Sequence, residues 1–190
     1  MLLVSKKYKK IVIKIIIILI FIIIMLILIN AYLIININVP TESMENTIHV
    51  DNKLIGSRIS YIISDINRYD IVVAEDPFIN NRMIVKRVVG LPGENVIIKE
   101  GDIYINGSKN PLKESYLKEK WVKNNNGYVF DIPQNHYLLL GDNRNNSADA
   151  RLWFEQMKSK NMCDLEKIYI SKEKIIAKII FCYAPQIKLF

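Results

Sequence analysis

The chain has 190 residues, of which 51% are hydrophobic, and it carries a formal net charge of +7 at pH 7. This length fits one domain of ordinary size, or a smaller domain with an anchor. A basic chain can bind nucleic acid or an anionic membrane surface. No basic patch is interleaved with aromatic residues, and no zinc-ligand spacing or recognition-helix pattern occurs, so we expect no nucleic-acid partner.

A long aliphatic run follows a basic N-terminus. Lysines gather in residues 1–10, and residues 11–35 are almost purely apolar. A run of this length crosses a hydrocarbon core of about 30 Å as a helix, which satisfies its own backbone in lipid. We therefore predict a cytoplasmic tail (1–10), a transmembrane helix (11–35) and an extracytoplasmic domain (36–190), oriented by the positive-inside rule.

The alternative for this run is a cleavable signal peptide. Its apolar stretch exceeds the usual core of about 7–15 residues, and no small-x-small cleavage site follows it. We therefore predict an uncleaved anchor in the cytoplasmic (plasma) membrane, with the lipid bilayer as one partner of the chain.

From residue 53 onward, short runs rich in β-branched residues alternate with turn signals. No long helical periodicity appears outside the anchor, so the predicted fold class is mainly β, with many short strands. Two segments are candidates for helix: the polar, weakly periodic residues 112–123 and residues 152–167. The predicted strands are residues 53–56, 69–74, 83–89, 95–99, 102–106, 128–132, 136–140 and 175–183.

Ser43 lies a few residues after the anchor and is a candidate nucleophile. A serine needs a neighbouring base that takes its proton. His49 and His136 are the 2 histidines of the chain. Each adjoins a strand-like segment without a carboxylate in a recognisable triad pattern, so an ordinary half-buried ring is the simpler interpretation of both.

Lys86 is the other candidate base. Strand alternation places it between Ile84 and Val88 on one face of the strand at 83–89. The default interpretation is an exposed charge on a sheet edge, because burying an ammonium group costs several kcal/mol. The alternative is a desolvated amine, whose pKa falls from about 10.4 by up to about 3–5 units into the range of a general base. The spacing alone leaves both interpretations open.

A polar loop at residues 141–151 reads Gly-Asp-Asn-Arg-Asn-Asn-Ser-Ala-Asp-Ala-Arg. A surface loop with Asx turns explains such a composition. The density of opposite charges indicates instead a hydrogen-bonded loop packed beside a site. These charges are Asp142, Arg144, Asp149 and Arg151.

Together these stretches resemble the sequence boxes of bacterial type I signal peptidases, the membrane serine proteases that cut signal peptides from exported proteins. Each box is weak alone, but their order and spacing and the preceding anchor all match the family. The resemblance covers about residues 35–151 and again 168–184. The boxes are Val-Pro-Thr-Glu-Ser-Met at 39–44, Arg-Tyr-Asp-Ile-Val-Val at 68–73, Lys-Arg-Val-Val-Gly-Leu-Pro-Gly-Glu at 86–94, and the loop at 141–151.

The resemblance implies a twisted, mainly β catalytic domain with a serine–lysine dyad. Ser43 would attack the scissile carbonyl, and Lys86 would act as the general base. The Thr41 hydroxyl and the Ser43 N–H would form the oxyanion hole, while Ser147 would orient the lysine amine. Structural support would come from the four charged residues of the loop at 141–151.

The resemblance also implies how a substrate is held. An extended peptide would add a strand along Met83, Ile84 and Val85 and along the segment before Ser43, which includes Pro40. Shallow pockets would accept small side chains at the first and third residues before the cut, the Ala-x-Ala pattern. The implied partners are secretory preproteins, no metal or organic cofactor is needed, and we expect a monomer.

The sequence departs from the family pattern without losing a reacting group. Asn46 stands where the family commonly has proline, Asn145 where aspartate is frequent, and Ala150 where serine is frequent. The small internal domain of larger relatives is reduced to about residues 95–135. This indicates the compact type with a single anchor.

The largest departure is an insert at about residues 152–167, which contains Trp153, Phe154 and Cys163. A short helix that covers the sheet is the simpler interpretation, and a flap that touches the membrane or a partner is the alternative. Cys163 and Cys182 are the 2 cysteines of the chain. They could form a disulfide or remain separate buried thiols.

Two other functions use similar features. A non-proteolytic assembly factor for surface polymers such as pili predicts a broken dyad, whereas both dyad residues are present. A self-cleaving repressor with serine–lysine chemistry needs a DNA-binding module, whereas residues 1–35 are a membrane segment. The sequence leaves open which preproteins are preferred and whether the role is general or dedicated.

Overall fold

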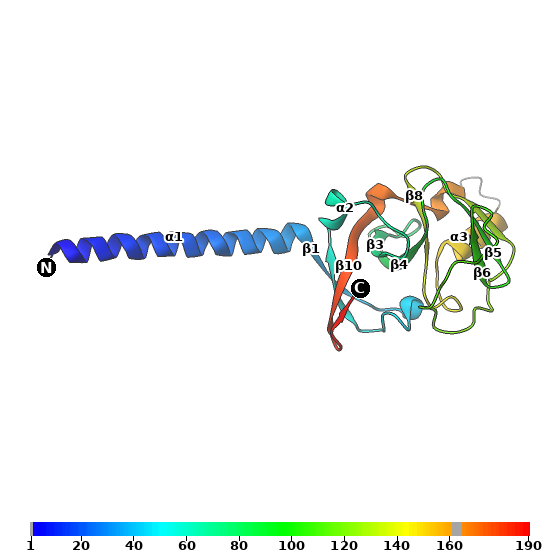
Figure 1. Cartoon of the computed structure of the whole chain (residues 1–190), viewed down its shortest axis with the longest axis horizontal. Coiled ribbons are helices and arrows are strands. Elements are labelled where there is room, and N and C mark those ends of the chain that lie inside the picture. The colour runs from blue at the N-terminus through cyan, green and yellow to red at the C-terminus, as the bar shows by residue number, and fades with distance from the viewer. Residues whose placement is uncertain (1, 161–164) are drawn as a thin grey trace.

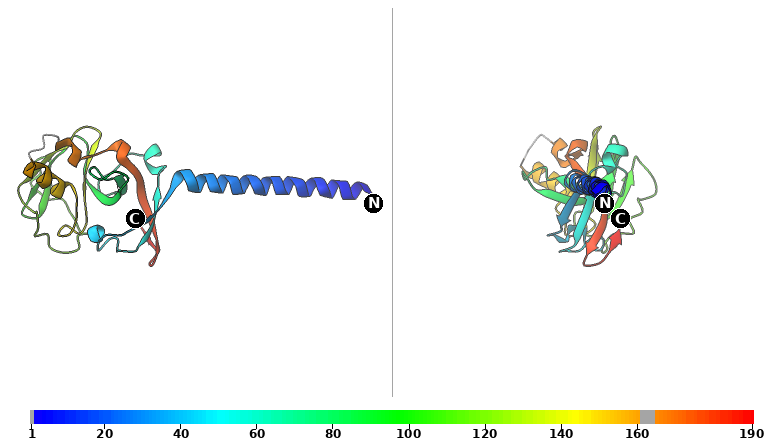
Figure 2. Two further views of the ribbon diagram at one scale, coloured as in Figure 1. Left: turned by 180° about the vertical axis from the view of Figure 1, so that it is seen from behind. Right: turned by 90° about the vertical axis from the view of Figure 1, so that its left-hand side faces the viewer.

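The computed structural model describes residues 2–160 and 165–190. One long helix, α1 (Leu2–Leu33), projects away from a compact β domain (Figure 1), and the view along the helix in Figure 2 shows the domain behind it. Tyr8–Ile29 within α1 has a mean hydropathy of 3.7 and buries none of its span in protein. Such a helix fits a membrane anchor.

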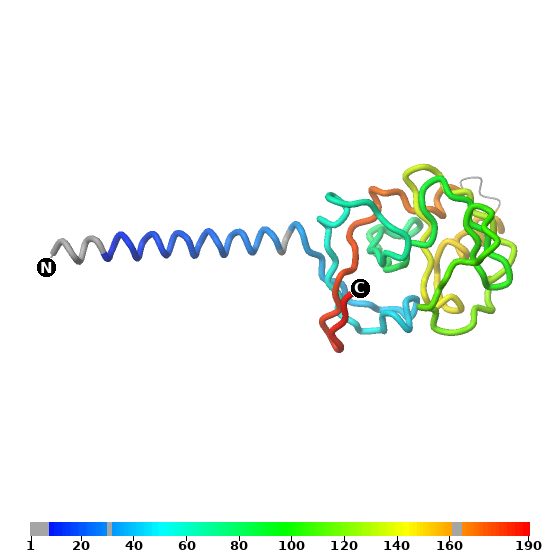
Figure 3. Tube along the Cα trace, in the orientation of Figure 1, coloured from blue at the N-terminus to red at the C-terminus, as the bar shows by residue number. Residues whose placement is uncertain are grey.

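The chain passes from α1 into the domain without a linker, as the continuous trace in Figure 3 shows. β1 (Ile34–Asn38) begins at the next residue and pairs antiparallel with β2 (Lys53–Ser57). The amide of Arg58 donates to the Leu33 carbonyl at 2.9 Å, which ties the end of α1 to the domain. The helix predicted through residue 35 ends at Leu33, because Ile34 and Ile35, which continue the apolar sequence after Asn30, pair with β2 as the start of β1.

The mainly β class is confirmed, and all the strand pairs of the described residues are antiparallel. An 8-stranded sheet has the order β1-β2-β10-β3-β4-β8-β9, with β11 paired to β10, and a 3-stranded sheet has the order β6-β5-β7. The remaining strands of the large sheet are β3 (Ile71–Glu75), β4 (Met83–Gly90), β8 (His136–Leu140), β9 (Ile170–Ser171), β10 (Ile175–Ala184) and β11 (Lys188–Leu189). The small sheet contains β5 (Asn95–Lys99), β6 (Asp102–Ile105) and β7 (Tyr128–Asp131).

Short helical turns connect the strands. They are η1 (Glu42–Met44), α2 (Ser60–Ile63), η2 (Leu165–Ile168) and η3 (Lys172–Lys174), and one longer helix is α3 (Ala150–Ser159). The helix predicted at residues 112–123 is wrong, because this segment is an irregular connection between β6 and β7.

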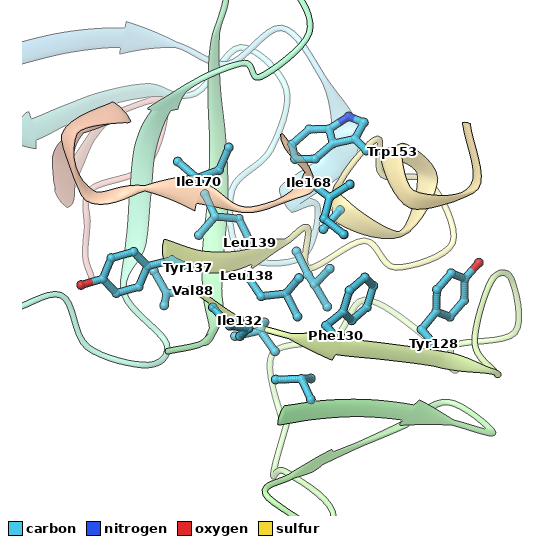
Figure 4. Packing of buried hydrophobic residues seen from close by; sticks show 14 of the residues in the cluster. Val88, Tyr128, Phe130, Ile132, Tyr137, Leu138, Leu139, Trp153, Ile168 and Ile170 are labelled. Atoms are coloured by element: carbon cyan, nitrogen blue, oxygen red, sulfur yellow. The ribbon is translucent and has the colours of Figure 1, made fainter. Parts of the chain in front are cut away.

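Apolar side chains pack on both faces of the large sheet. One cluster joins Val88 and Leu138 to Trp153 of α3 and also takes in the inner face of the small sheet (Figure 4). A second cluster contains Met44 and Val73, and Val85 of β4 packs against this cluster. β4 therefore contributes to both cores, and the half of the strand that begins at Lys86 is buried on both faces.

The described part of the insert fits the covering-helix interpretation. Trp153 and Met157 of α3 are buried, and Phe154 packs edge-on against the rings of Tyr128 and Phe130 in β7. Cys163 lies outside the described residues, so the disulfide alternative for Cys163 and Cys182 also falls outside them. Cys182 is buried, and its thiol donates to the Ala184 carbonyl at 3.3 Å.

The end of β4 generates a prediction about packing. A register shift interrupts the pairing of β4 with β8 near Gly90, and a Cβ there would lie 2.2 Å from Ile132 Cδ1. We expect Gly90→Ala to lower the free energy of unfolding by about 1–3 kcal/mol, measured as a lower Tm of the purified protein. Gly90→Ala/Ile132→Val, which lacks the opposing methyl group, should recover part of the loss. An unchanged Tm in Gly90→Ala would show that this core is not close-packed.

Candidate active site

Ser43 and Lys86 come together from distant parts of the chain. Ser43 lies in η1 and Lys86 in the middle of β4. Lys86 Nζ lies 2.7 Å from Ser43 Oγ and donates to the Val85 carbonyl at 3.2 Å. Ser43 is 8% exposed and Lys86 4% exposed. The interpretation of Lys86 as an exposed edge charge is therefore wrong.

Burial changes the acid–base behaviour of this amine. Desolvation is the largest effect, and it lowers the pKa of Lys86 to about 8, although the charges of Asp149 and Asp76 partly oppose it. The charged form is disfavoured because the protein supplies less solvation than water. An amine with such a pKa can accept a proton near neutral pH.

The turn that carries Ser43 holds further hydrogen-bond donors. Thr41 is the N-cap residue of η1, and its hydroxyl lies 3.4 Å from Ser43 Oγ. The N–H of Ser43 belongs to the first turn of this short helix, where amides have no acceptor within the helix. The role of both groups as oxyanion donors stays a prediction.

The loop at residues 141–151 packs directly on this turn. The Asn143 N–H donates to the Ser43 carbonyl and its Nδ2 to the Glu42 carbonyl, both at 3.0 Å. A Cβ on Gly141 would lie 2.4 Å from the Ser43 carbonyl oxygen and 2.2 Å from Ser147 Oγ. Only glycine therefore fits at this position without moving Ser43.

Ser147 lies beside the site, but the structure does not join it to the lysine. Its Oγ is buried and has no hydrogen-bond partner among the described residues. The role of Ser147 in orienting the Lys86 amine therefore stays a prediction.

The aspartates of the loop pair with two buried arginines. Arg87, the neighbour of Lys86, binds Asp142 through Nε at 2.8 Å and Nη2 at 2.6 Å. Arg151 binds Asp149 through Nε at 2.9 Å and Nη2 at 2.8 Å. Burial raises the pKa of Asp149, but the Arg151 charge and the Gly141 N–H outweigh it, so the net shift is downward. Charge-assisted bidentate pairs of this kind fix both partners.

A groove of about 610 Å³ opens onto the dyad. One wall comes from residues 36–44, the other from residues 81–86, and both Ser43 and Lys86 line it. All the predicted substrate-binding residues line it as well: Pro40, Met83, Ile84 and Val85.

One edge of β4 faces this groove. β3 pairs with residues 83–87 of β4, whereas pairing with β8 begins only at Arg87. The N–H and C=O of Val88 bond toward β3, so strand alternation turns the backbone groups of Val85 and Met83 toward the groove. Within the described chain no strand covers this edge. An unpaired edge of this kind is a template for an extended peptide.

The sequence profile of the signal peptidase, peptidase S26, family matches residues 12–184. The chain belongs to this family. Signal peptidase I of Leptolyngbya laminosa is 38% identical over 127 residues, which are 60% of this chain and 58% of that protein. Signal peptidase I V of Bacillus subtilis (strain 168) is 31% identical over 140 residues, which are 67% of this chain and 80% of that protein.

A solved structure of a signal peptidase I from Enterococcus faecalis V583 aligns with a TM-score of 0.44 and 25% sequence identity, covering 61% of this chain and 97% of that chain. The present chain spans 58%, 53% and 63% of the length of three curated relatives that it matches.

Neither histidine takes part in the site. His49 Nδ1 lies 2.5 Å from Glu45 Oε1, and His136 Nδ1 lies 3.0 Å from the Gln134 carbonyl oxygen. Among the described residues that line the groove there is no histidine. The serine–histidine interpretation is therefore not supported in this signal peptidase family member.

The sequence interpretation missed partners of the site in the irregular segment between β6 and β7. Arg144 pairs with Glu114 at 3.0 Å and 2.5 Å rather than with an aspartate of its own loop. Tyr116 and Trp121 stack on buried arginines. The one available signal was an isolated tryptophan in a strongly polar stretch, which the weak helix prediction did not explain.

The burial of Lys86 predicts the pH at which its amine becomes reactive. Amines react with acylating reagents as the free base, and Lys86 lines an open groove. Competitive acylation of the detergent-solubilised S26 chain, followed by mass spectrometry, should show half-reaction of Lys86 near pH 8. In the urea-unfolded chain the same lysine should half-react at about pH 10.4, because the charged amine is then solvated. Equal values in the two states would contradict the assigned environment.

Proposed function

We propose that the chain is a membrane-anchored serine endopeptidase that cleaves N-terminal signal peptides from exported preproteins. The observation that carries the proposal is the 2.7 Å distance between Lys86 Nζ and Ser43 Oγ beside a groove with a free strand edge. Membership of the S26 family supports it, as do relatives named signal peptidase I. No step of the mechanism uses a metal or an organic cofactor.

In the first step the neutral Lys86 amine takes the proton of the Ser43 hydroxyl as Oγ bonds to the scissile carbonyl carbon. The carbonyl oxygen becomes an oxyanion, which the Ser43 N–H and the Thr41 hydroxyl would stabilise. Donors of this kind are each worth about 10²–10³ in rate. The tetrahedral intermediate then collapses, and the ammonium of Lys86 protonates the departing amine.

In the second step a water molecule attacks the acyl group on Ser43. Lys86, neutral again, takes one proton from this water, and the new tetrahedral intermediate expels Oγ. Lys86 returns the proton to Oγ, which restores the hydroxyl and releases the carboxylic acid. A single buried amine can serve both steps because a pKa of about 8 lets it both accept and donate a proton near neutral pH.

The substrate would bind as an added strand on the groove edge of β4. Backbone groups of Met83 and Val85 would provide the ladder hydrogen bonds, and the segment around Pro40 the opposite wall. The groove is lined near the dyad by apolar side chains such as Ile37, Met44 and Ile84. Small residues at the first and third positions before the cut fit this lining, the Ala-x-Ala type.

We further propose the arrangement in the membrane. The basic tail (1–10) lies in the cytoplasm, α1 spans the cytoplasmic membrane, and the catalytic domain (36–190) lies outside it as a monomer. The substrates are secretory preproteins, whose cleavage sites also emerge at the bilayer surface. Confinement of both partners to one surface raises their effective concentration.

The alternative is a non-proteolytic assembly factor for surface polymers such as pili. Such a factor has no need of a buried amine with a lowered pKa in contact with a serine hydroxyl. The assembled pair of Ser43 and Lys86 therefore favours the peptidase.

Removal of either dyad residue tests the proposed activity. We expect Ser43→Ala and Lys86→Met to abolish cleavage of a preprotein with an Ala-x-Ala site in detergent or lipid, because each variant lacks a reacting group. Cleavage is measured by gel mobility and by the N-terminal sequence of the product. Lys86→Met preserves the apolar stem, so an unchanged Tm would separate lost chemistry from lost folding. The proposal is wrong if the wild type does not cleave the preprotein, or if either variant cleaves it as well as the wild type does.

Gly141 tests the contact between the loop and the nucleophile. Gly141→Ala places a methyl group where the Ser43 carbonyl and the Ser147 hydroxyl lie. We expect the rate of preprotein cleavage to fall by about 10²-fold, because a shift of about 1 Å at a reacting group is sufficient for such a loss. Gly107→Ala is the control, since a Cβ there meets no described atom within 4 Å and the strain from its φ of 71° lies outside the groove lining. Equal activity of both variants would contradict the tight packing.

A further inference from the structure

The connection between β6 and β7 buries side chains that an ordinary surface loop would expose. We call residues 112–123 of this connection the strap. The Glu114 side chain is 6% exposed and Trp121 is 3% exposed, although neighbours such as Lys118 are exposed. Loops generally run over the surface because their polar groups need water. The strap is therefore held by specific partners.

The first set of partners consists of arginines of the site. The guanidinium carbon of Arg87 lies 4.0 Å from the centre of the Tyr116 ring. The Tyr116 hydroxyl donates to Glu114 Oε1 at 2.5 Å, and Glu114 in turn binds Arg144 with both oxygens. A continuous chain of contacts thus joins the residue next to Lys86 to the loop at 141–151.

Trp121 completes this set from the other end of the strap. Its ring stacks on Arg144 at 4.7 Å and on Arg151 at 4.9 Å, and its Nε1 donates to the Lys123 carbonyl at 2.6 Å. Cation–π contacts strengthen when the cation is shielded from water, as both guanidinium groups are here.

The strap also balances the charge of the loop. The loop's two aspartates neutralise two of the three buried arginines. Arg144 remains, and its ion-pair partner is Glu114 of the strap. Since a buried guanidinium cannot lose its proton, the loop needs this carboxylate to stay in place.

The second set of partners consists of asparagines at positions where the sequence departs from the family pattern. Asn46 has a φ of 83°, which proline cannot adopt, and its Nδ2 donates to the carbonyls of Tyr116 and Leu117 at 3.1 Å and 3.3 Å. Asn145 Oδ1 accepts from the amides of Val122 and Lys123 at 2.9 Å and 3.0 Å. Both departures thus bind the strap.

These contacts lead to the reacting atoms by short routes. Arg144 Nε donates to the Gly141 carbonyl at 3.0 Å, and Gly141 packs against the Ser43 carbonyl. Arg87 follows Lys86 in β4 and pairs with Asp142 of the loop. Asn46 lies in the turn that follows Ser43.

We propose that the strap is a positioning element, in which Glu114, Tyr116 and Trp121 fix the buried arginines and thereby hold the Ser43 turn, β4 and the loop in register. This inference rests on the proposed function of the dyad. The strap residues do not line the groove, so they act through the arginines and leave substrate binding to the groove itself.

The test uses variants that change no net charge. Tyr116→Leu removes the ring beneath Arg87, and Asn145→Ala removes the side chain that binds Val122 and Lys123. We expect kcat for preprotein cleavage to fall about tenfold or more in each variant, with KM within about twofold. Misplaced reacting groups stabilise the transition state less, whereas the groove still binds the substrate. Tyr116→Phe, which keeps the ring, should retain most of kcat. Val122→Ala, at an exposed strap side chain, is the matched control.

A second readout does not depend on cleavage. The half-reaction pH of Lys86 with an acylating reagent should rise from about 8 toward its unfolded value in Tyr116→Leu. Water would then solvate the Lys86 amine more fully, because the elements that bury it are less firmly held. A lower Tm with kcat and half-reaction pH unchanged in Tyr116→Leu and Asn145→Ala would overturn the proposal and leave the strap a stabilising element only. If the wild type cuts no preprotein, the peptidase proposal fails, and the shift in half-reaction pH alone decides the role of the strap. Should Tyr116→Leu not fold, Asn145→Ala compared with the control Val122→Ala gives the same decision.

Discussion

The structure depends on keeping one amine out of water while a hydroxyl stays within hydrogen-bond distance of it. Lys86 can tolerate burial because an amine can give up its proton, and desolvation lowers its pKa for that reason. Arg87, the next residue, is buried as well but cannot become neutral, so it needs a bidentate aspartate and an aromatic ring. Adjacent residues on one strand therefore respond to burial in different ways: the pKa of Lys86 falls, whereas Arg87 stays charged and is paired.

This constraint explains why β4 lies inside the sheet and why both of its faces are covered. Val88 packs into one core and Val85 against the other, so a lysine between them meets little water. The strand nevertheless keeps a free edge over residues 83–86, since β8 pairs only with its far half. A buried base and an accessible backbone edge on one strand are what a peptidase that binds extended chains requires.

Local patterns predicted eight of the eleven described strands, because period-two alternation and turn residues are properties of neighbouring positions, but they missed β1, β9 and β11. The strand at 83–89 and the hairpin of β5 and β6 are examples. The burial of Lys86 was not decided by alternation, since it depends on which distant segments cover the strand. Ser43 and Lys86 were paired through the family resemblance and not through spacing. Glu114 was missed because its partner Arg144 is 30 residues away.

The absence of a linker between α1 and β1 has a mechanical consequence. A five-residue strand spans about 17 Å, and β1 is hydrogen-bonded to β2 along its whole length. Ser43 is thus joined to the end of the helix through a hydrogen-bonded strand and not through a flexible tether. Under the proposed function, this rigid connection would favour substrates whose scissile bond lies at one distance from the bilayer. Length between the apolar segment and the cut would then be selected along with side-chain size.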